Sequence, residues 1–358
     1  MILPKHFAGK KYKKGAMFTD IHFGKHSNSA IHNQDCLDFI DWFVDNVKKD
    51  PSIDHIIFLG DWNENRSALN ISTLNYSYIG AKKLNQLGLP VFFIIGNHDL
   101  YQRHTRDIHS VISFNEFSNF ILIDSITQVD EVGDGVIFCP FLFHEEYKEL
   151  QKYREISTWY GHFEFKGFMV TGYGMKMPTG PDANDFTGPS RIFSGHFHKR
   201  QIEKNICYIG NTFPMDFGDT NDLERGMAIY EYASDDLQFL NWKECPKYVK
   251  IKLSELLEDK TFELDVKARV KCVIDMPLEY EESTALKQKF QTEAGLREFT
   301  LEESKISDSE ISDIQTDVNV DDLGSTDDLV IKMLSDIENE QIDSELLISI
   351  YKELQVVQ

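Results

Sequence analysis

The chain contains five short clusters of Asp, His and Asn, and each cluster follows a short hydrophobic run. Runs of this kind, ended by Gly or a polar turn, are typical of buried strands. The clusters are therefore predicted on loops at strand ends, where α/β folds place their chemistry. They are Asp20 to His22, Gly60–Asp61, Gly96 to Asp99, Gly161–His162 and Gly195 to His198. This pattern favours an α/β fold that brings the five clusters to one place.

Two of the clusters hold polar side chains two residues apart. Side chains two apart on a strand point to the same side, so Asp20 with His22, and His196 with His198, each aim two donors at one point. A lone pair of this kind means little in a chain with 12 His, but five such clusters in order favour a shared metal site. Mixed His, Asp and Asn donors suit divalent ions of intermediate hardness, Mn²⁺ above all, with Fe²⁺ and Zn²⁺ as alternatives.

The same residues suit hydrolysis of a phosphodiester with two metal ions. A carboxylate that gives one oxygen to each of two ions holds them roughly 3.5–4 Å apart, a spacing that favours in-line displacement at phosphorus. Asp61 is the natural bridging residue of this set. Hydrolysis of a phosphodiester also needs a general acid at the leaving oxygen. His98, which lies between Asn97 and Asp99, is the best-placed acid.

The clusters resemble the motifs of calcineurin-like metallophosphoesterases. The strings FTDIHFG, FLGDWNENR, IIGNHDLY, YGHFEFKG and SGHFHKR are similar to those of the SbcD-type DNA repair nucleases, across residues 15–235. The segments 208–212 and 224–226 strengthen this likeness. Within the family, the chain is most similar to the nuclease subunits of tailed-phage recombination endonucleases. The resemblance implies a four-layer α/β/β/α sandwich.

The resemblance also implies a role for each residue of the clusters. One metal would be held by Asp20, His22, Asp61 and His198, and the other by Asp61, Asn97, His162 and His196. His98 would be the transition-state acid, oriented by Asp99. The family follows its bridging Asp with a hydrophobic residue, Phe, and Asp or His, whereas this chain has Trp62, Asn63 and Glu64. Glu64 is expected to replace the family's Asp or His, and Trp62 to pack in the core.

The sequence predicts two domains followed by a tail. Strand-like alternation and a helical segment at 285–294 favour a small α+β domain, which the resemblance identifies as a capping domain. An acidic segment rich in Asp, Ser and Glu has the composition of a linker, and two amphipathic helices, 327–337 and 343–356, end the chain as a helical hairpin. The predicted parts are the metallophosphoesterase domain 1–240, the capping domain 245–303, the linker 304–326 and the partner-docking hairpin 327–358.

Composition bears on the location of the protein. No apolar run reaches the 18 or more residues that a membrane span needs, and the N-terminal lysines are not followed by the apolar segment of a signal peptide. The five Cys are widely spaced without a CxxC motif, which predicts reduced, buried thiols. We expect a cytoplasmic protein, in the host cytoplasm if a phage encodes it.

Charge is distributed unevenly along the chain. The formal net charge is −22, but residues 1–125 have equal numbers of basic and acidic side chains, and most of the net negative charge lies beyond residue 250. Arg66, Lys199 and Arg200 lie next to the clusters and are expected to meet phosphates of a DNA substrate. Without a strong basic field, the chain should bind DNA weakly by itself and need a partner.

The resemblance supplies two partners. One is an SMC-like ABC ATPase with long coiled coils, which the apolar faces of the C-terminal helices would bind. This chain has no P-loop motif of its own, so any ATP dependence would come from that subunit. The other is a second copy of the chain, through predicted helices at 35–47 and 69–87 with contacts at Tyr76, Ile79 and Leu84.

The predicted function is that of a Mn²⁺-dependent DNA exonuclease and endonuclease in recombination, repair and replication. Protein phosphatases carry GDxVDRG and GNHE where this chain has GDWNENR and GNHD, and purple acid phosphatases need a Tyr ligand that residues 62–65 do not offer. A scaffold with a decayed site is disfavoured by the complete ligand set. A phosphodiesterase for cyclic nucleotides or other small molecules remains the alternative, since it also carries GNHD and GHxH.

Overall fold

The computed structural model describes residues 3–170, 175–220, 222–258, 265 and 267–303 of the chain. The described residues up to Glu302 belong to one compact unit. The predicted linker 304–326 and helical hairpin 327–358 lie outside the described residues and stay predictions.

The first of two six-stranded sheets has the order β12-β11-β1-β2-β3-β4. Its strands β1 to β4 run parallel, while β11 and β12 are antiparallel to their neighbours. The strands are β1 Lys14–Phe18, β2 His55–Phe58, β3 Val91–Ile94, β4 Phe120–Ile123, β11 Gly226–Glu231 and β12 Asp236–Asn241. Almost all residues of β1, β2 and β3 are buried, which explains their uninterrupted hydrophobic sequences.

The second sheet has the order β5-β6-β7-β8-β10-β9. Strands β6, β7, β8 and β10 are parallel, and the edge strands β5 and β9 are antiparallel to them. The strands are β5 Thr127–Val129, β6 Val136–Cys139, β7 Thr158–Gly161, β8 Arg191–Ser194, β9 Gln201–Glu203 and β10 Ile206–Tyr208. In both sheets the ligand-bearing loops follow parallel strands.

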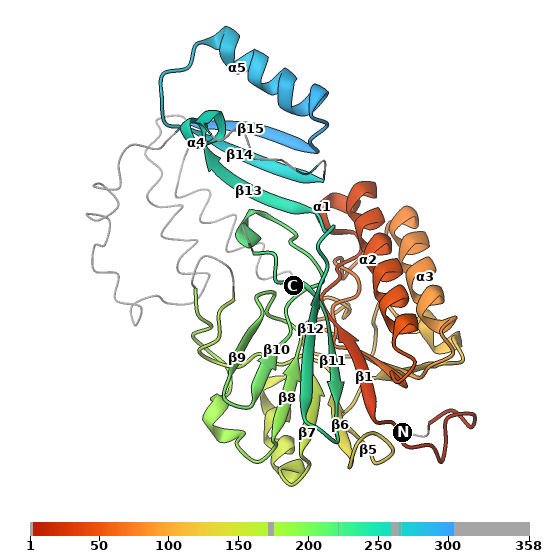
Figure 1. Cartoon of the computed structure of the whole chain (residues 1–358). Coiled ribbons are helices and arrows are strands. Elements are labelled where there is room, and N and C mark those ends of the chain that lie inside the picture. Colours follow the sequence, from red (N-terminus) through yellow and green to blue (C-terminus); the bar gives the residue numbers. More distant parts are fainter. Residues whose placement is uncertain (1–2, 171–174, 221, 259–264, 266, 304–358) are drawn as a thin grey trace, which may run out of the picture. The chain divides into compact units, whose positions relative to one another are not determined.

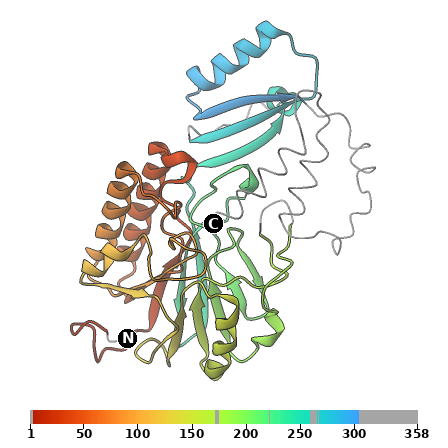
Figure 2. The same ribbon diagram turned by 180° about the vertical axis from the view of Figure 1, so that it is seen from behind.

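Helices and loops cover the outer faces of the two sheets, and this confirms the predicted sandwich. Helices α2 (Ala30–Lys49) and α3 (Ile71–Asn85) lie along the first sheet (Figures 1 and 2), and the 3-10 helix η2 (His144–Tyr153) packs with loops on the second. A separate apolar core fills the space between the sheets. The shorter helices are α1 Lys25–Asn28, η1 Ile112–Glu116, η3 Ala183–Asp185 and η4 Phe217–Asp219.

Two predictions about α2 and α3 need correction. Helix α2 begins five residues earlier than predicted, because Ser29 caps it by accepting a hydrogen bond from the backbone N–H of His32. Leu84 of α3 is fully buried in the protein's own core. Leu84 was therefore wrongly predicted as a contact with a second copy, since it has no surface to offer one. Tyr76 and Ile79 are partly buried against the same core.

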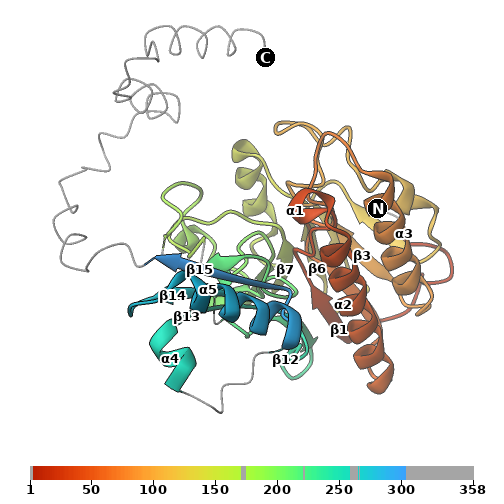
Figure 3. The ribbon, with the colours of Figure 1, turned by 90° about the horizontal axis from the view of Figure 1, so that it is seen from above.

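The segment that follows the second sheet forms a three-stranded sheet of order β13-β14-β15. Helix α5 lies across one face of this sheet (Figure 3), and Leu286 and Phe290 pack on the small apolar core there. The elements are β13 Lys247–Lys252, α4 Leu253–Glu258, β14 Ala268–Ile274, α5 Tyr280–Lys287, the π-helical turn η5 Gln288–Glu293 and β15 Glu298–Glu303. Helix α5 begins five residues before the predicted helical segment at 285–294, because Glu282 caps it by accepting a hydrogen bond from the backbone N–H of Glu279.

The five Cys are free and buried, as the sequence predicts. Among the residues that the structure describes, none of the helices has the length and apolar content needed to cross a membrane.

Candidate dinuclear metal centre

The seven predicted metal ligands converge at the carboxyl ends of five parallel strands. Asp20 and His22 follow β1, Asp61 follows β2 and Asn97 follows β3, while His162 follows β7 and the pair at 196 and 198 follows β8. Because these ends meet where the two sheets face each other, loops far apart in sequence become neighbours. Possible ligand atoms form three groups within 4.8 Å: Asp20, His22 and His198; Asp61, His162 and His196; and His22, Asp61 and His98.

Four of the ligands lie in the left-handed region of backbone conformation. The φ angles are 52° for Asp20 and His22, 61° for Asp61 and 89° for His196. Only a few per cent of residues other than Gly adopt positive φ, and the cost is typically tolerated at functional sites. The sharp backbone turn lets a loop leave its strand and aim its side chain back over the strand end.

Two of the Gly residues before the ligands are there because no side chain fits. A Cβ on Gly96 would overlap the carboxylate of Asp61, and a Cβ on Gly60 would overlap the ring of His162. Gly60 also has a φ of 106°, which other residues rarely adopt. Gly60 thus lets the loop of His162 approach, and Gly96 lets the loop of Asp61 approach.

The first ligand group joins the β1 loop to the β8 loop. Nε2 of His22 lies 3.1 Å from Nε2 of His198, and each of these nitrogens is 3.8 Å from Oδ1 of Asp20. The Asp20 carboxylate accepts hydrogen bonds from the hydroxyl of Thr19 and the backbone N–H of His196. These contacts hold three ligand atoms around one point.

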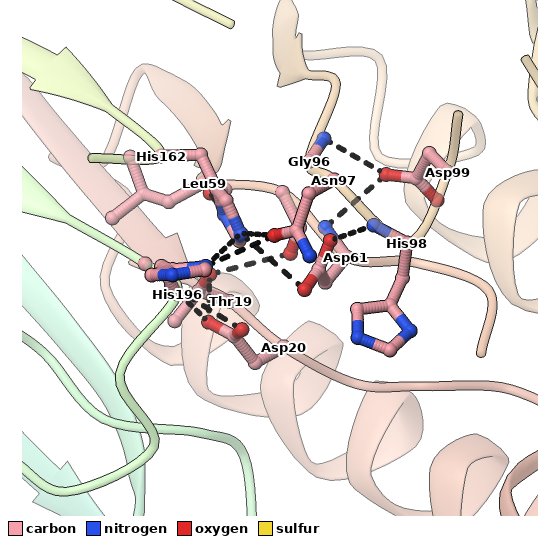
Figure 4. Close-up of polar contacts among 12 residues, drawn as sticks. Thr19, Asp20, Leu59, Asp61, Gly96, Asn97, His98, Asp99, His162 and His196 are labelled. Atoms are coloured by element: carbon pink, nitrogen blue, oxygen red, sulfur yellow. Dashed lines mark hydrogen bonds and ion pairs between the residues drawn. The ribbon is translucent and has the colours of Figure 1, made fainter. Parts of the chain in front are cut away.

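The second ligand group gathers around the side-chain oxygen of Asn97 (Figure 4). This Oδ1 lies 2.9 Å from Nε2 of His162 and 2.9 Å from Nδ1 of His196. Oδ2 of Asp61 lies 3.3 Å from Nε2 of His162 and 3.9 Å from Nε2 of His22. Asp61 is thus within reach of both groups, which is the position that a bridging ligand requires.

The outward nitrogens of three imidazoles face oxygen acceptors, and two of these contacts are hydrogen bonds. Nδ1 of His162 donates to the carbonyl oxygen of Leu59 at 2.7 Å, so Nε2 is the nitrogen that can bind a metal once it has lost its proton. Nε2 of His196 lies 3.1 Å from Glu164. Nδ1 of His22 lies 2.7 Å from a carboxylate oxygen of Glu64, although the two are not aligned as a hydrogen bond. Partners of this kind orient metal-binding imidazoles.

Glu164 is a partner of the centre that was not predicted from the sequence. Glu164 stands two residues after His162 in the string GHFEF. Residues two apart on a strand point to the same side, so this spacing could have indicated Glu164, as it did Asp20 and His22. Glu64, in contrast, was singled out from the sequence, and the structure pairs it with His22.

The donor set fits two divalent ions. It offers carboxylate and amide oxygens with imidazole nitrogens, the mixture that ions of intermediate hardness prefer. Burial opposes protonation of His22, but the carboxylates of Asp20 and Glu64 raise its pKa to about 10. Burial likewise opposes protonation of His162, and Asp61 raises its pKa to about 9. Metal uptake at these nitrogens must displace protons.

The structure corrects one predicted contact. Asp99 was predicted to orient His98, but its carboxylate accepts hydrogen bonds from the backbone N–H groups of Gly96, Asp61, Trp62 and Asn63. The ring of His98 points away from it (Figure 4), and Nδ1 of His98 lies 2.9 Å from the carbonyl oxygen of Glu64. Asp99 therefore ties the β2 and β3 loops together. Burial and the charge of Asp61 raise its pKa to about 7.

Trp62 lies in the core, as predicted. Its side chain is fully buried against Phe18, Phe58 and Phe93, and its indole N–H donates to Ser77 at 2.8 Å. It has no surface on which a base of a substrate could stack.

A family model, that of the calcineurin-like phosphoesterases, matches residues 16–200, which is just over half of the chain. The chain belongs to the calcineurin-like phosphoesterase family. The matched residues include every one of the seven ligands described above. This phosphoesterase is therefore a metal-dependent enzyme of phosphoester hydrolysis, and the clusters from Asp20 to His198 are its candidate metal centre.

Two curated relatives of this phosphoesterase are nucleases or repair proteins. Exonuclease subunit 1 of Enterobacteria phage T4 is 26% identical over 185 residues, 51% of this chain and 54% of that protein. The DNA double-strand break repair protein Mre11 of Methanocaldococcus jannaschii is 22% identical over 305 residues, 79% of each chain. The chain thus aligns with only about half the length of the phage protein.

A solved dimetal phosphatase from Danio rerio covers 62% of this chain and 93% of its own, at 8% identity and a TM-score of 0.41. A likeness this slight carries no further conclusion.

Proposed function

We propose that the protein hydrolyses phosphodiester bonds of DNA with two Mn²⁺ ions, as an exonuclease and endonuclease in recombination, repair and replication. The observation that carries this proposal is the position of Asp61, whose Oδ2 lies 3.9 Å from Nε2 of His22 in the first ligand group and 3.3 Å from Nε2 of His162 in the second. The imidazole of His98 lies beside the same carboxylate. The names of the two curated relatives, an exonuclease subunit and a double-strand break repair protein, support DNA as the substrate.

Seven side chains would hold the two ions. Asp20, His22, Asp61 and His198 would bind one ion, and Asp61, Asn97, His162 and His196 the other. Two divalent ions held there would supply an activated water molecule and neutralise charge that develops on the phosphate. The two Asp carboxylates compensate only part of the charge of two divalent ions. The remaining positive charge favours a phosphodiester anion at the centre.

His98 would pass a proton to the leaving oxygen. Its Nδ1 is taken by the carbonyl oxygen of Glu64, so Nε2 is the nitrogen that can face a substrate. The backbone N–H of His98 donates to Asp61 at 2.8 Å, which fixes the loop that carries the ring. One third of the side chain is exposed, enough for a substrate to touch it. General acid catalysis of this kind accelerates hydrolysis typically by about 10²–10⁴-fold.

A coiled-coil ATPase of the SMC type is proposed as the partner, through the amphipathic pattern of residues 327–358, with a second copy of the chain as a further partner. The excess of acidic residues beyond residue 250 supports the need for help with DNA. Truncation before Asp327 should abolish co-purification with such an ATPase and leave Mn²⁺-dependent cleavage of short DNA nearly unchanged. If the truncated chain lost both its folding and its cleavage of DNA, the proposal that residues 327–358 serve only to bind a partner would be wrong.

The test of the proposed function is an assay of the purified chain with Mn²⁺ on labelled single-stranded and double-stranded DNA. Bis-p-nitrophenyl phosphate and cyclic AMP serve as comparison substrates in the same assay. We expect DNA cleavage that stops on addition of a chelator and returns with added Mn²⁺. Rapid hydrolysis of cyclic AMP without cleavage of DNA would instead identify a small-molecule phosphodiesterase.

A further inference from the structure

A cavity of about 630 Å³ opens beside the second ligand group. Asn97, His196 and Glu164 belong both to its lining and to the metal centre or its outer partners. The cavity and the centre therefore share a wall, and a molecule bound at the metals would extend into the cavity. Its volume lies within the range of about 300–1,000 Å³ that is typical of pockets for one small molecule.

One wall of the cavity is aromatic and is fixed in place. The ring of Phe141 lies 5.7 Å from the ring of His196 and 6.1 Å from that of His162, measured between centroids. The guanidinium of Arg106 lies 4.8 Å above the ring of Phe143, and it donates to the carbonyl oxygen of Phe141 at 2.8 Å. This wall is present before any substrate arrives.

The lining of the cavity includes two arginines, Arg66 and Arg103. In the part of the chain that the structure describes, Arg66 and Arg103 form no ion pair within 4.0 Å, whereas Arg106 pairs with Glu146 and Arg297 with Asp35. Burial and the neighbouring charge of Arg103 lower the pKa of Arg66. Two like charges that lie near each other, with neither held in an ion pair among the described residues, suit an anion that can bind both.

We propose that this cavity is a nucleotide subsite of the enzyme. It takes the base and sugar of one unpaired nucleotide beside the scissile phosphate, with the base against Phe141 and Phe143. Arg66 and Arg103 bind the next phosphate along the strand. The inference rests on the proposed function and deepens it, because it makes a single-stranded polynucleotide, or an unpaired strand end, the preferred substrate. A cyclic nucleotide would use the aromatic wall but would leave the two arginines without a phosphate.

Three substrates separate these contacts. Bis-p-nitrophenyl phosphate has the scissile phosphodiester alone, the p-nitrophenyl ester of thymidine 5′-phosphate adds one nucleoside, and a single-stranded oligothymidylate adds further phosphates. For each variant, kcat/KM on the two larger substrates is divided by kcat/KM on bis-p-nitrophenyl phosphate. These ratios cancel any general damage to the metal centre.

The double variant Arg66→Gln, Arg103→Gln should lower the oligothymidylate ratio about 10- to 100-fold, since hydrogen bonds to charged groups are the stronger ones. The thymidine ester ratio should change less than about twofold, because this substrate has no second phosphate with which the arginines could form such hydrogen bonds. The salt dependence of oligothymidylate binding should also become shallower, by a slope of roughly 0.7 for each phosphate that the variant no longer neutralises. Lys48→Gln, Lys49→Gln removes the same charge at the C-terminal end of α2 and should leave both ratios unchanged.

The variant Phe143→Ala should lower both ratios about tenfold, the order of the effect of removing one aromatic ring that stacks on a base. Unchanged ratios in Phe143→Ala, or an unchanged oligothymidylate ratio in the arginine variant, would overturn the subsite. A wild-type enzyme that hydrolyses the thymidine ester but not DNA would refute the proposed nuclease function instead. In that case, the thymidine ester ratio of Phe143→Ala still decides whether the cavity binds a nucleoside.

Discussion

The metal centre and the three-stranded sheet at 247–303 are held in place by different kinds of contact. At the centre, the side chains of Asp20, Asp61 and His162 are almost completely buried, and their loops leave strands of an apolar core. Among the described residues, the small sheet has a core of only seven buried side chains. It meets α2 through charges, with Arg297 2.5 and 2.7 Å from Asp35.

Because the contacts differ, changes at the metal centre and changes where the small sheet meets α2 should have different effects. Ligands on loops between closely packed strands have little freedom to shift, so each change at the centre should act strongly on metal binding and catalysis. Contacts between charged groups, such as Lys267 with Asp38 at 3.1 Å, can exchange with water at modest cost. Changes at the contact between the small sheet and α2 should therefore alter the stability of the folded protein more than its hydrolysis of a small substrate.

The largest expected effect is that of Asp61→Asn. One carboxylate lies within reach of both ligand groups, so its loss should weaken both metal sites together and abolish measurable hydrolysis at micromolar Mn²⁺. Elemental analysis and isothermal titration with Mn²⁺ measure the two sites. Loss of one ion with normal binding of the other would break the assignment of Asp61 as the bridge.

His98→Ala should leave both metals bound and lower kcat on DNA by about 10²–10⁴-fold, the usual contribution of a general acid. The reason is that Nδ1 of His98 is held by the carbonyl oxygen of Glu64, and the proposed ligand sets of both ions are complete without His98. Hydrolysis of a substrate with a p-nitrophenyl leaving group provides the control, because that group needs no proton and should be affected less. A variant that loses a metal would show that His98 is a ligand.

Glu164→Gln and Glu64→Gln form a matched pair. Each removes a carboxylate charge beside one imidazole, His196 in the first case and His22 in the second. Loss of such an outer partner typically lowers metal affinity about 10–100-fold. Mn²⁺ titration should show weakening of a different ion in each variant. Equal weakening of the same ion in both would contradict the division into two ligand groups.

Arg297→Gln should have the smallest effect on chemistry. Hydrolysis of bis-p-nitrophenyl phosphate should be close to that of the wild type, while the free energy of unfolding falls by about 1.5–3 kcal/mol, because buried Asp35 loses a charged hydrogen-bond partner. Arg191→Gln removes the exposed pair with Asp235 and should cost about 0–1 kcal/mol. Equal denaturant midpoints for the two variants would show that the Arg297–Asp35 pair stabilises the protein no more than the exposed Arg191–Asp235 pair.

Much of the site was predictable because its ligands follow hydrophobic strands in a fixed order. Parallel strands end at one edge of a sheet, so Asp20, Asp61 and Asn97 had to become neighbours once their strands paired. The resemblance to metallophosphoesterases then brought the β7 and β8 loops to the same place. The division of all seven ligands between the two ions stays a prediction until metals are observed.

Other features depend on tertiary packing that the sequence does not show locally. Asp99 follows His98 directly, yet its carboxylate turns inward, because four backbone N–H groups of two loops need an acceptor there. The left-handed backbone of Asp20 and Asp61 has no sequence signal beyond the enrichment of Asp in that conformation. Leu84 reads as an exposed contact in a helical pattern, and only the packing of α3 on α2 shows that it is buried.

The most direct test of two ions that share Asp61 is a crystal structure of the Mn²⁺-loaded protein with anomalous scattering data. Two Mn²⁺ peaks are expected, roughly 3.5–4 Å apart with one oxygen of Asp61 on each. One ion should also contact Asp20, His22 and His198, and the other Asn97, His162 and His196. A single ion, or an ion held by His22, Asp61 and His98, would contradict the account.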